Sequence, residues 1–364
     1  MQQERNVQFD IQNAFYRPAS SLARDLGVLA AAIYRQDHPC LRVLDVMTGC
    51  GIRSLRYAFE SQADWVWAND ADPEVAPVLK QNLSQLKVGY QITHRPAKQI
   101  FADCYQRQDF YDLVDIDSFG HPSPYFSTSL QATKIGGLIY LTGTDSRTVA
   151  GHDPENCLCH YGTYGRSHPA AQEQGLRILI GSLQQQAMMQ GFSVEPIFSL
   201  FQGQIYRVMV RLTKAQTPFA EQYGFLGHCH RCGHYQTVGW RYLSQANCPD
   251  CSLPLTLSGP MWLGRLHDPT FLGRMIVLAQ NWNWSKRVCL LELMVAEAEM
   301  PPYFYTVGDL GKRGQMDIPK RDRIIQSLQQ AGYLACATHI NTQAIKTTAT
   351  FKQCLQIASQ LGKS

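Results

Sequence analysis

The sequence contains no long apolar run among its 364 residues. No stretch approaches the ~18–20 apolar residues that a membrane-spanning helix needs. The opening Met-Gln-Gln-Glu-Arg lacks the charged-then-apolar pattern of a secretory signal. Internal repeats and low-complexity tracts are also missing. We therefore expect a soluble, cytoplasmic protein that does not associate with membranes, and no feature indicates an obligate protein partner.

Charged residues of either sign are in little excess. The chain has 33 Lys and Arg against 29 Asp and Glu, a net charge of +4. This mild excess permits an acidic partner but does not require one. It is concentrated in residues 301–364, which contain eight Lys or Arg, three Asp and no Glu. Such a terminal segment favours phosphate contacts, although a solvated basic face is a nearly equal alternative.

Cysteine, in contrast, is plentiful, with twelve residues. In an intracellular protein these are thiols and metal ligands rather than a disulfide framework. Two Cys-x-x-Cys pairs are separated by fifteen residues: Cys229 with Cys232, and Cys248 with Cys251. Two such knuckles place four thiolates around one Zn²⁺ and leave no open position. The spacing predicts a structural zinc site.

Apolar segments alternate with helical patterns from residue 41 to residue 212. We expect strands at 41–47, 65–70, 112–116, 136–142 and 205–212, and helices near 20–35, 52–62, 73–86 and 169–190. This alternation predicts an α/β fold with a mostly parallel sheet. Residues 259–284 contain three of the six Trp residues and three Gly. Helical patterns at 286–299, 303–312, 319–331 and 348–361, with a β-like turn at 333–340, predict a helix-rich, winged-helix-like module.

The predicted strand at 41–47 leads into a glycine loop. Asp45 lies near the end of this strand, and Gly49 and Gly51 stand between the strand and the next helix. Glycines let a backbone approach a ligand closely, and free amides at a helix N-terminus attract negative charge. Asp70 follows 19 residues after Gly51, where a carboxylate accepts hydrogen bonds from ribose hydroxyls. The alternative for the glycines alone is an ordinary strand-to-helix turn.

The glycine loop lacks the third glycine of the dinucleotide fingerprint. Ser54 and Leu55 stand where it would fall. S-adenosylmethionine has no pyrophosphate, so the shorter loop favours it over NAD. Arg53, in the first helical turn, is unfavourable beside the positive end of the helix dipole unless it pairs with an anion. The methionine carboxylate of S-adenosylmethionine is such an anion.

A second loop, Asp117-Ser118-Phe119-Gly120, follows the strand at 112–116. It is similar to the Asp/Asn-Pro-Pro-Tyr/Phe loop of amino-group methyltransferases. A carboxylate such as Asp117 that accepts a hydrogen bond from a base amine pushes the nitrogen lone pair towards a methyl donor. Phe119 would stack on the base, which must first leave its stacked position in the folded nucleic acid. Phe15 is a candidate for the opposite face of the base pocket. A turn-capping Asp117 and a core Phe119 are the structural alternatives.

The ordered set of motifs resembles the tRNA (guanine-26 N2) dimethyltransferase family over nearly the whole chain. The matching segments are Phe15-Tyr16-x-Pro18, Arg24-Asp25, Gly49-x-Gly51-Ile52-Arg53, Asn69-Asp70, Asp115-x-Asp117-x-Phe119-Gly120, Thr142-x-Thr144-Asp145, Tyr161-Gly162, the four cysteines, Gly259-Pro260-x-Trp262-Leu263-Gly264, Thr338-His339 and Ile345-Lys346-Thr347. The resemblance implies transfer of one or two methyl groups from S-adenosylmethionine to guanine N2 at position 26 of tRNA. It implies a Rossmann-like class I methyltransferase domain (residues 1–215) and a zinc-containing, tRNA-binding C-terminal domain (residues 216–364).

The resemblance also assigns roles to individual residues. Arg24, Arg53 and Asp70 would bind the cofactor, Asp117 would accept from the guanine amine, and Phe15 and Phe119 would sandwich the base. The sequence departs from the family at Ser118, where proline is usual. It departs again at Arg95-Pro96-Ala97, where the family has Asp-Ala near the adenine. At Ala97 a backbone amide remains to contact the adenine ring.

Two other functions fit parts of the pattern. The amine-handling loop suits adenine N6 in DNA or another tRNA guanine equally well, because these amines require the same acceptors. A non-catalytic, zinc-containing RNA-binding protein would retain the loops as structure alone. The sequence does not distinguish monomethylation from dimethylation, and it does not give the oligomeric state.

Overall fold

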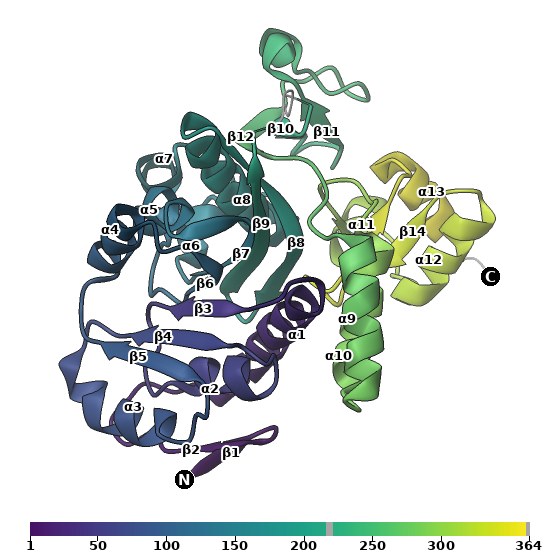
Figure 1. Ribbon diagram of the computed structural model, residues 1–364. Helices are drawn as coiled ribbons and strands as arrows, with labels where there is room; N and C mark the ends of the chain where they lie inside the picture. Colours follow the sequence, from purple (N-terminus) through teal and green to yellow (C-terminus); the bar gives the residue numbers. More distant parts are fainter. Residues whose placement is uncertain (216–220, 362–364) are drawn as a thin grey trace.

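The computed structural model describes residues 1–215 and 221–361. Its centre is a seven-stranded sheet in the order β5-β4-β3-β6-β7-β9-β8 (Figure 1). Strands β5, β4, β3, β6 and β7 pair in parallel, and β9 is antiparallel to both of its neighbours. The predicted α/β fold is confirmed. The strands are β3 (Arg42–Asp45), β4 (Trp65–Asn69), β5 (Gly89–Thr93), β6 (Tyr111–Ile116), β7 (Thr133–Gly143), β8 (Phe192–Gln202) and β9 (Ile205–Lys214).

Both faces of the sheet are buried, because successive residues of its central strands pack into different cores. Val43 of β3 packs with α1, whereas the next residue, Leu44, lies in the core formed with α4 and α8. Strands covered on both faces read as continuous apolar runs, which is why the sequence predicts them. One face carries α1 (Ser21–Asp37), α2 (Ile52–Phe59) and α3 (Ala76–Leu83), and the other carries α4 (Ala97–Arg107), α5 (Phe126–Leu130) and α8 (Ala171–Met189).

The N-terminal segment forms a hairpin of β1 (Gln2–Glu4) and β2 (Val7–Phe9) before α1 begins. Val7 and Phe9 are buried in a small core with α2, whereas the intervening Gln8 is exposed. This alternation fixes the hairpin on the sheet domain. Two short helices follow β7: α6 (Ser146–Val149) and α7 (Pro154–Tyr161).

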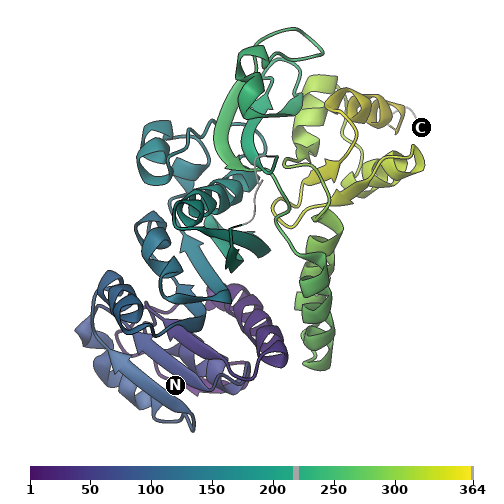
Figure 2. The ribbon, with the colours of Figure 1, turned by 45° about the horizontal axis from the view of Figure 1, so that its top comes forward.

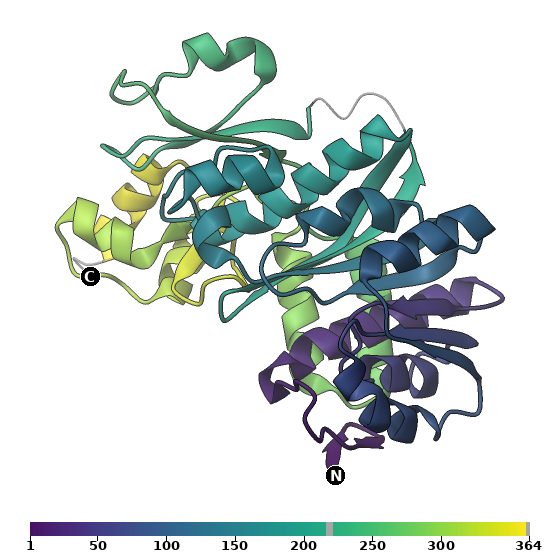
Figure 3. The same cartoon turned by 90° about the vertical axis from the view of Figure 1, so that its left-hand side faces the viewer.

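The cysteine-containing segment forms a small antiparallel sheet of β10 (Tyr223–His228), β11 (Tyr235–Val238) and β12 (Thr256–Trp262). It lies at the end of the molecule opposite the N-terminal hairpin (Figure 3). Strand β12 packs against α8 at Gly181, where a Cβ would come within 2.8 Å of the Trp262 backbone nitrogen. Arg177 of α8 donates from Nη1 to the carbonyl oxygens of Trp262 and Gly264, at 3.2 and 2.8 Å.

A helical hairpin connects this sheet to the C-terminal module. It consists of α9 (Pro269–Asn281) and α10 (Ser285–Glu297), and it runs between α1 and the C-terminal module (Figures 1 and 2). The module contains β13 (Tyr305–Thr306), α11 (Val307–Gly314), α12 (Arg321–Gln330), β14 (Ala335–Ala337), β15 (Ala344–Thr347) and α13 (Phe351–Leu361). With α10, this order of elements and the sheet β13-β15-β14 give the winged-helix-like arrangement predicted for the tail.

Buried ion pairs tie the C-terminal elements to the sheet domain. Lys346 of β15 donates from Nζ to Glu173 Oε1 of α8 at 2.6 Å, and both side chains are almost completely buried. Arg287 of α10 donates from Nε to Asp25 Oδ2 of α1 at 2.7 Å. Because a buried charge is costly unless it is paired, these contacts fix the two parts of the chain relative to each other.

After residue 262, the structure adds one helix to the predicted elements and shortens another. Residues 269–281 form α9, which the sequence patterns do not predict as a helix; Asp268 accepts hydrogen bonds from the amides of Thr270 and Phe271 and so caps it. Residues 305–306 form β13, so the helix expected at 303–312 begins only at Val307. The predicted domain boundary at 215/216 adjoins residues 216–220, which lie outside the described residues, and the division stays a prediction.

A membrane-spanning helix is absent from the described ranges 1–215 and 221–361: each of their helices is too short or too polar to cross a bilayer.

Candidate active site

A cavity of about 240 Å³ opens at the carboxyl ends of β3, β4, β6 and β7. Its walls come from the loops after these strands, from β9 and from the N-terminal arm. The strand order reverses between β3 and β6, which is where open α/β sheets bind their ligands. The sequence-predicted residues that line this cavity are Phe15, Arg24, Gly49, Arg53, Asp70, Asp117 and Phe119.

The glycine loop is shaped by left-handed backbone conformations. Gly49 and Gly51 have φ angles of +55° and +84°. At Gly51 a Cβ would also lie 2.8 Å from Cδ1 of both Leu79 and Leu83 in α3, so glycine is required for packing as well. The Gly49 amide donates to Asp70 Oδ2 at 2.8 Å, which holds the loop against the end of β4.

Asp45 supports this loop from below and does not line the cavity. Its Oδ2 accepts hydrogen bonds from the hydroxyls of Thr48 and Ser54, at 2.7 and 2.8 Å. Burial, together with the neighbouring charge of Asp115, raises the pKa of Asp45 to about 7. The structure therefore places Asp45 beneath the cavity, where it fixes the loop, and its role in binding the cofactor stays a prediction.

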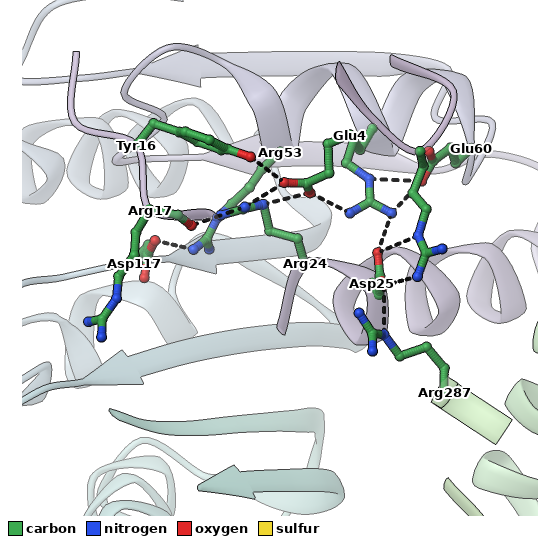
Figure 4. Close-up of polar contacts among 11 residues, drawn as sticks. Glu4, Tyr16, Arg17, Arg24, Asp25, Arg53, Glu60, Asp117 and Arg287 are labelled. Atoms are coloured by element: carbon green, nitrogen blue, oxygen red, sulfur yellow. Dashed lines mark hydrogen bonds and ion pairs between the residues drawn. The ribbon is translucent and has the colours of Figure 1, made fainter. Parts of the chain in front are cut away.

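Asp117 lies between two arginines at the carboxyl end of β6. Arg53 donates to Asp117 through Nη2 (Figure 4). Its Nη1 donates to Asp115 Oδ1 at 2.7 Å. Arg207 of β9 contributes a second ion pair, with Nη2 3.2 Å from Asp117 Oδ1. Burial alone would raise the pKa of Asp117, but the charges of Arg53 and then Arg207 outweigh it and hold this pKa well below its usual range.

The loop that carries Asp117 is fixed to the end of β7. Ser118 donates from Oγ to the Thr142 carbonyl at 3.0 Å, and the Gly120 amide donates to Thr144 Oγ1 at 2.8 Å. The Thr144 amide donates back to the Gly120 carbonyl at 2.8 Å. The serine that replaces the expected proline therefore holds the loop through a hydrogen bond instead of a fixed φ angle.

Phe15 and Phe119 meet at the cavity entrance. Their ring centroids are 5.1 Å apart and the ring planes are inclined by 73°. The two residues are 66% and 74% exposed, so neither belongs to a core. A planar base placed between them requires the rings to separate and turn parallel. Exposed aromatic rings at the mouth of a polar cavity are suited to stacking on such a base.

Arg24 belongs to a buried network around the N-terminal arm (Figure 4). Its Nε and Nη2 donate to the two carboxylate oxygens of Glu4, at 2.8 and 2.5 Å. The same carboxylate accepts from Tyr16 Oη at 2.9 Å and from Arg56 Nη1 at 2.7 Å. Glu4 therefore positions both a cavity arginine and the arm that presents Phe15.

Ala97 lies outside the cavity. It opens α4 and is buried, and the preceding Arg95 is held at the end of β4 by the Asn69 side chain. Asn69 donates from Nδ2 to the Arg95 carbonyl at 2.9 Å and accepts from the Arg95 amide at 3.1 Å. The structure thus brings this segment beside the end of β4, and the contact of Ala97 with a ligand stays a prediction.

The four predicted zinc ligands converge. Cys229 and Cys251 have their Sγ atoms 3.4 Å apart, and Cys232 and Cys248 have theirs 3.3 Å apart. Zn–S bonds of about 2.3 Å put the thiolates of a tetrahedral site about 3.8 Å apart, so a small outward shift accommodates the ion. The closed donor set fits a structural zinc.

Sequence reasoning missed two groups at the site. Arg207 is a charged residue between the apolar residues Tyr206 and Val208 of β9, which is the signal that could have identified it. Glu4 carries no comparable local signal, because its partners lie 12 to 52 residues away in the sequence.

Comparison with known proteins places the chain in a family. The family described as N2,N2-dimethylguanosine tRNA methyltransferase matches residues 1–359. Proteins named tRNA (guanine(26)-N(2))-dimethyltransferase from Methanothermobacter thermautotrophicus and Thermococcus kodakarensis are 28% and 29% identical over 356 and 358 residues. These alignments cover 95% and 93% of this chain and 93% and 90% of the relatives.

A solved structure shares the fold. The complex of Trm1 from Pyrococcus horikoshii with S-adenosyl-L-methionine superposes with a TM-score of 0.86 at 24% identity, covering 98% of each chain. The similarity in fold and the family match agree with the motifs around the cavity. This chain belongs to the N2,N2-dimethylguanosine tRNA methyltransferase family.

Proposed function

We propose that this protein transfers one or two methyl groups from S-adenosylmethionine to the exocyclic N2 of guanine 26 in tRNA. The observation that carries the proposal is the position of Asp117. This carboxylate lies at the end of β6, inside the cavity and next to the exposed pair Phe15 and Phe119. The family match over nearly the whole chain supports the same reaction.

The donor set of the cavity fits the cofactor. Asp70, at the end of β4, offers carboxylate oxygens for ribose hydroxyls, and Arg24 and Arg53 offer guanidinium groups for the methionine carboxylate. Asp45 and Gly51 would maintain the shape of the Gly49 loop from outside the cavity, and Ala97 would supply a backbone amide near the adenine. When bound, S-adenosylmethionine supplies an electrophilic methyl group.

Asp117 would orient the amine rather than remove its proton. Two arginines hold the pKa of Asp117 far below neutrality, so the carboxylate stays an ionised hydrogen-bond acceptor. An acceptor fixed beside N2 aligns the nitrogen lone pair and stabilises the positive charge that develops during methyl transfer. Phe15 and Phe119 would hold the guanine plane between them.

The C-terminal part of the chain would bind the tRNA. Residues 301–364 have an excess of basic residues, and Tyr242, in the connection between β11 and β12, is 62% exposed. Lysine and arginine contact phosphates, and exposed aromatic rings stack on bases. We place the protein in the cytoplasm, where unmodified tRNA is available.

Radiolabelled methyl transfer to tRNA transcripts with guanine or adenine at position 26 tests the proposal. Label recovered as N2-methylated guanosine only from the guanine transcript is the expected result. We expect Asp117→Asn to lower kcat by about 10²- to 10³-fold while tRNA binding is retained. Asp37→Asn is the matched control, since Asp37 forms an exposed ion pair with Arg274 far from the cavity.

Other outcomes would point to different functions. Label on duplex DNA, or on tRNA regardless of position 26, would keep the chemistry and change the substrate. RNA binding without affinity for S-adenosylmethionine would instead indicate the non-catalytic binding protein. Analysis of the labelled nucleosides distinguishes mono- from dimethylguanosine.

A further inference from the structure

Arg207 is a buried charged residue of the central sheet. It lies in β9 between the buried residues Tyr206 and Val208 and is 4% exposed. Burying a guanidinium is costly unless it is paired. Its partners lie at the candidate site: Nη1 donates to Thr142 Oγ1 at 2.8 Å, and Nη2 lies 3.2 Å from Asp117 Oδ1.

The other arginine on Asp117 already has several partners. Arg53 binds Asp115 and Asp117 at once, and it also faces the cavity. In the proposed function Arg53 contributes to binding the methionine carboxylate. One guanidinium shared by the buried Asp115, the partly exposed Asp117 and a carboxylate of the cofactor would leave Asp117 weakly held. Arg207 supplies the second positive charge that this cluster needs.

We propose that Arg207 is a positioning residue for the reaction. It holds Asp117 as a hydrogen-bond acceptor aimed at the base amine while Arg53 contributes to binding the cofactor. This inference rests on the proposed function.

The geometry favours arginine over lysine at this position. The guanidinium plane presents Nη1 to the end of β7 and Nη2 to the loop after β6, so it sets the angle between them. The Lys ammonium is a single point charge on a flexible stem and would not hold both partners at these positions. We therefore expect Arg207→Lys to keep the charge and lose the orientation.

Steady-state kinetics of the full chain separate this role from a structural one. For Arg207→Gln we expect kcat to fall by about 10- to 100-fold, with KM for tRNA and the Kd of S-adenosylmethionine unchanged within about twofold. Arg207→Lys should fall less, because it retains the positive charge. Calorimetric binding of S-adenosylmethionine to each variant also establishes that the variant is folded.

The pH profile of kcat provides a second readout. Removing one cation raises the pKa of Asp117, so the acid limb of the Arg207→Gln profile should shift to higher pH, and that of Arg207→Lys should shift less. The charged, titratable and hydroxyl groups that act on Asp117 come from α2, β6, β7 and β9: Arg53, Asp115, Tyr140, Thr142 and Arg207.

Arg211→Gln is the matched control. Arg211 lies four residues further along β9, and its guanidinium stacks over the Phe271 ring, outside the cavity. We expect its kinetics and pH profile to be unchanged.

The outcomes are distinguishable. Wild-type protein that transfers no methyl group contradicts the proposed function itself. Active wild type together with unchanged kcat and pH profile in Arg207→Gln overturns the role of Arg207 alone. A large rise in the Kd of S-adenosylmethionine would also overturn it, by making Arg207 a cofactor ligand. Should Arg207→Gln bind no cofactor because it is unfolded, Arg207→Lys decides: wild-type kcat and pH profile in this variant overturn the inference.

Discussion

The carboxylate of Glu4, on the first strand of the chain, forms a bidentate ion pair with Arg24, which faces the cavity beyond it. The pair is buried on both sides, with 7% and 4% of the two side chains exposed. Glu4 thus contributes directly to the electrostatics of the site.

Glu4→Gln should destabilise the fold and weaken cofactor binding. Removing the anion leaves Arg24 and Arg56 buried without their shared partner, which we expect to cost about 3 kcal/mol in the free energy of unfolding. Urea denaturation measures the first effect and calorimetry with S-adenosylmethionine the second. Glu74→Gln, an exposed carboxylate after β4, is the control; equal losses in both variants would refute the role of Glu4.

Gly51→Ala should destabilise the protein more than Gly136→Ala, although the two glycines have almost the same φ angle, +84° and +88°. Each substitution places a side chain in the left-handed region at about 1 kcal/mol. At Gly136 nothing lies within 4 Å of the new Cβ, whereas at Gly51 it collides with Leu79 and Leu83. We expect an additional loss of about 1–3 kcal/mol at Gly51 in chemical denaturation. Similar losses of stability at both positions would show that α3 shifts to accommodate the new methyl group without further destabilising the fold.

Phe119→Ala should lower kcat/KM for tRNA by about 10- to 100-fold and leave the melting temperature unchanged. The expected size is that of one base–aromatic stack. Stability should not change, because the ring is 74% exposed. Phe59→Ala, which removes an exposed ring 45% accessible and outside the cavity, serves as control. A lower melting temperature in Phe119→Ala would assign the ring to packing.

Cys232→Ser should release the metal and destabilise the sheet formed by β10, β11 and β12. Elemental analysis of the wild type should give one zinc per chain and of the variant none, with a lower melting temperature, because metal binding to such a site is coupled to folding. Cys159→Ser is the control, since Cys159 is an exposed thiol outside the cluster. Full zinc content in Cys232→Ser would contradict the four-thiolate site.

Glu297→Gln should reduce stability most at neutral pH. Glu297 is buried with His267 and His339, at the junction of α10 and the C-terminal module. Burial alone would raise the pKa of Glu297, but His339 and His267 outweigh it and hold this pKa well below its usual value. A carboxyl group with a lowered folded-state pKa stabilises the protein above its unfolded pKa and loses this contribution as the pH falls.

The wild type and Glu297→Gln should therefore differ by about 2–3 kcal/mol at pH 7, and the difference should shrink below about pH 4.5. The pKa of His267 is lowered by burial, so its protonation adds to the loss of stability below about pH 6.5. Urea unfolding between pH 4 and pH 7 measures both effects, with exposed Glu292→Gln as control. A pH-independent difference would contradict the assigned ionisation.

The sequence predicts the elements whose signals are local. Strands β3, β4 and β6 are rich in apolar residues because both of their faces are buried, and the glycine loop and the Cys-x-x-Cys pairs are short motifs. Strand β5 escaped prediction because it is an edge strand with mostly exposed residues. Its pairing with β4 places it in the sheet, although its own composition does not indicate a strand.

Long-range partnerships account for the remaining differences. The sequence around Arg207 does not indicate its pairing with Asp117, which lies 90 residues earlier. The two residues meet only because β9 is inserted antiparallel beside β7. The same holds for Glu4, whose partners are in α1 and α2. Motif spacing identifies groups that act within one loop, whereas groups brought together by strand order require the structure.

The buried contact between Lys346 and Glu173 has a consequence for substrate choice. It locks the C-terminal module to α8, and so sets a constant separation between the basic tail and the mouth of the cavity. A tRNA bound to that tail would therefore be held at a fixed distance from the cavity. The nucleotide that reaches Asp117 would be selected by its distance from the gripped stem, with little dependence on the identity of its neighbours.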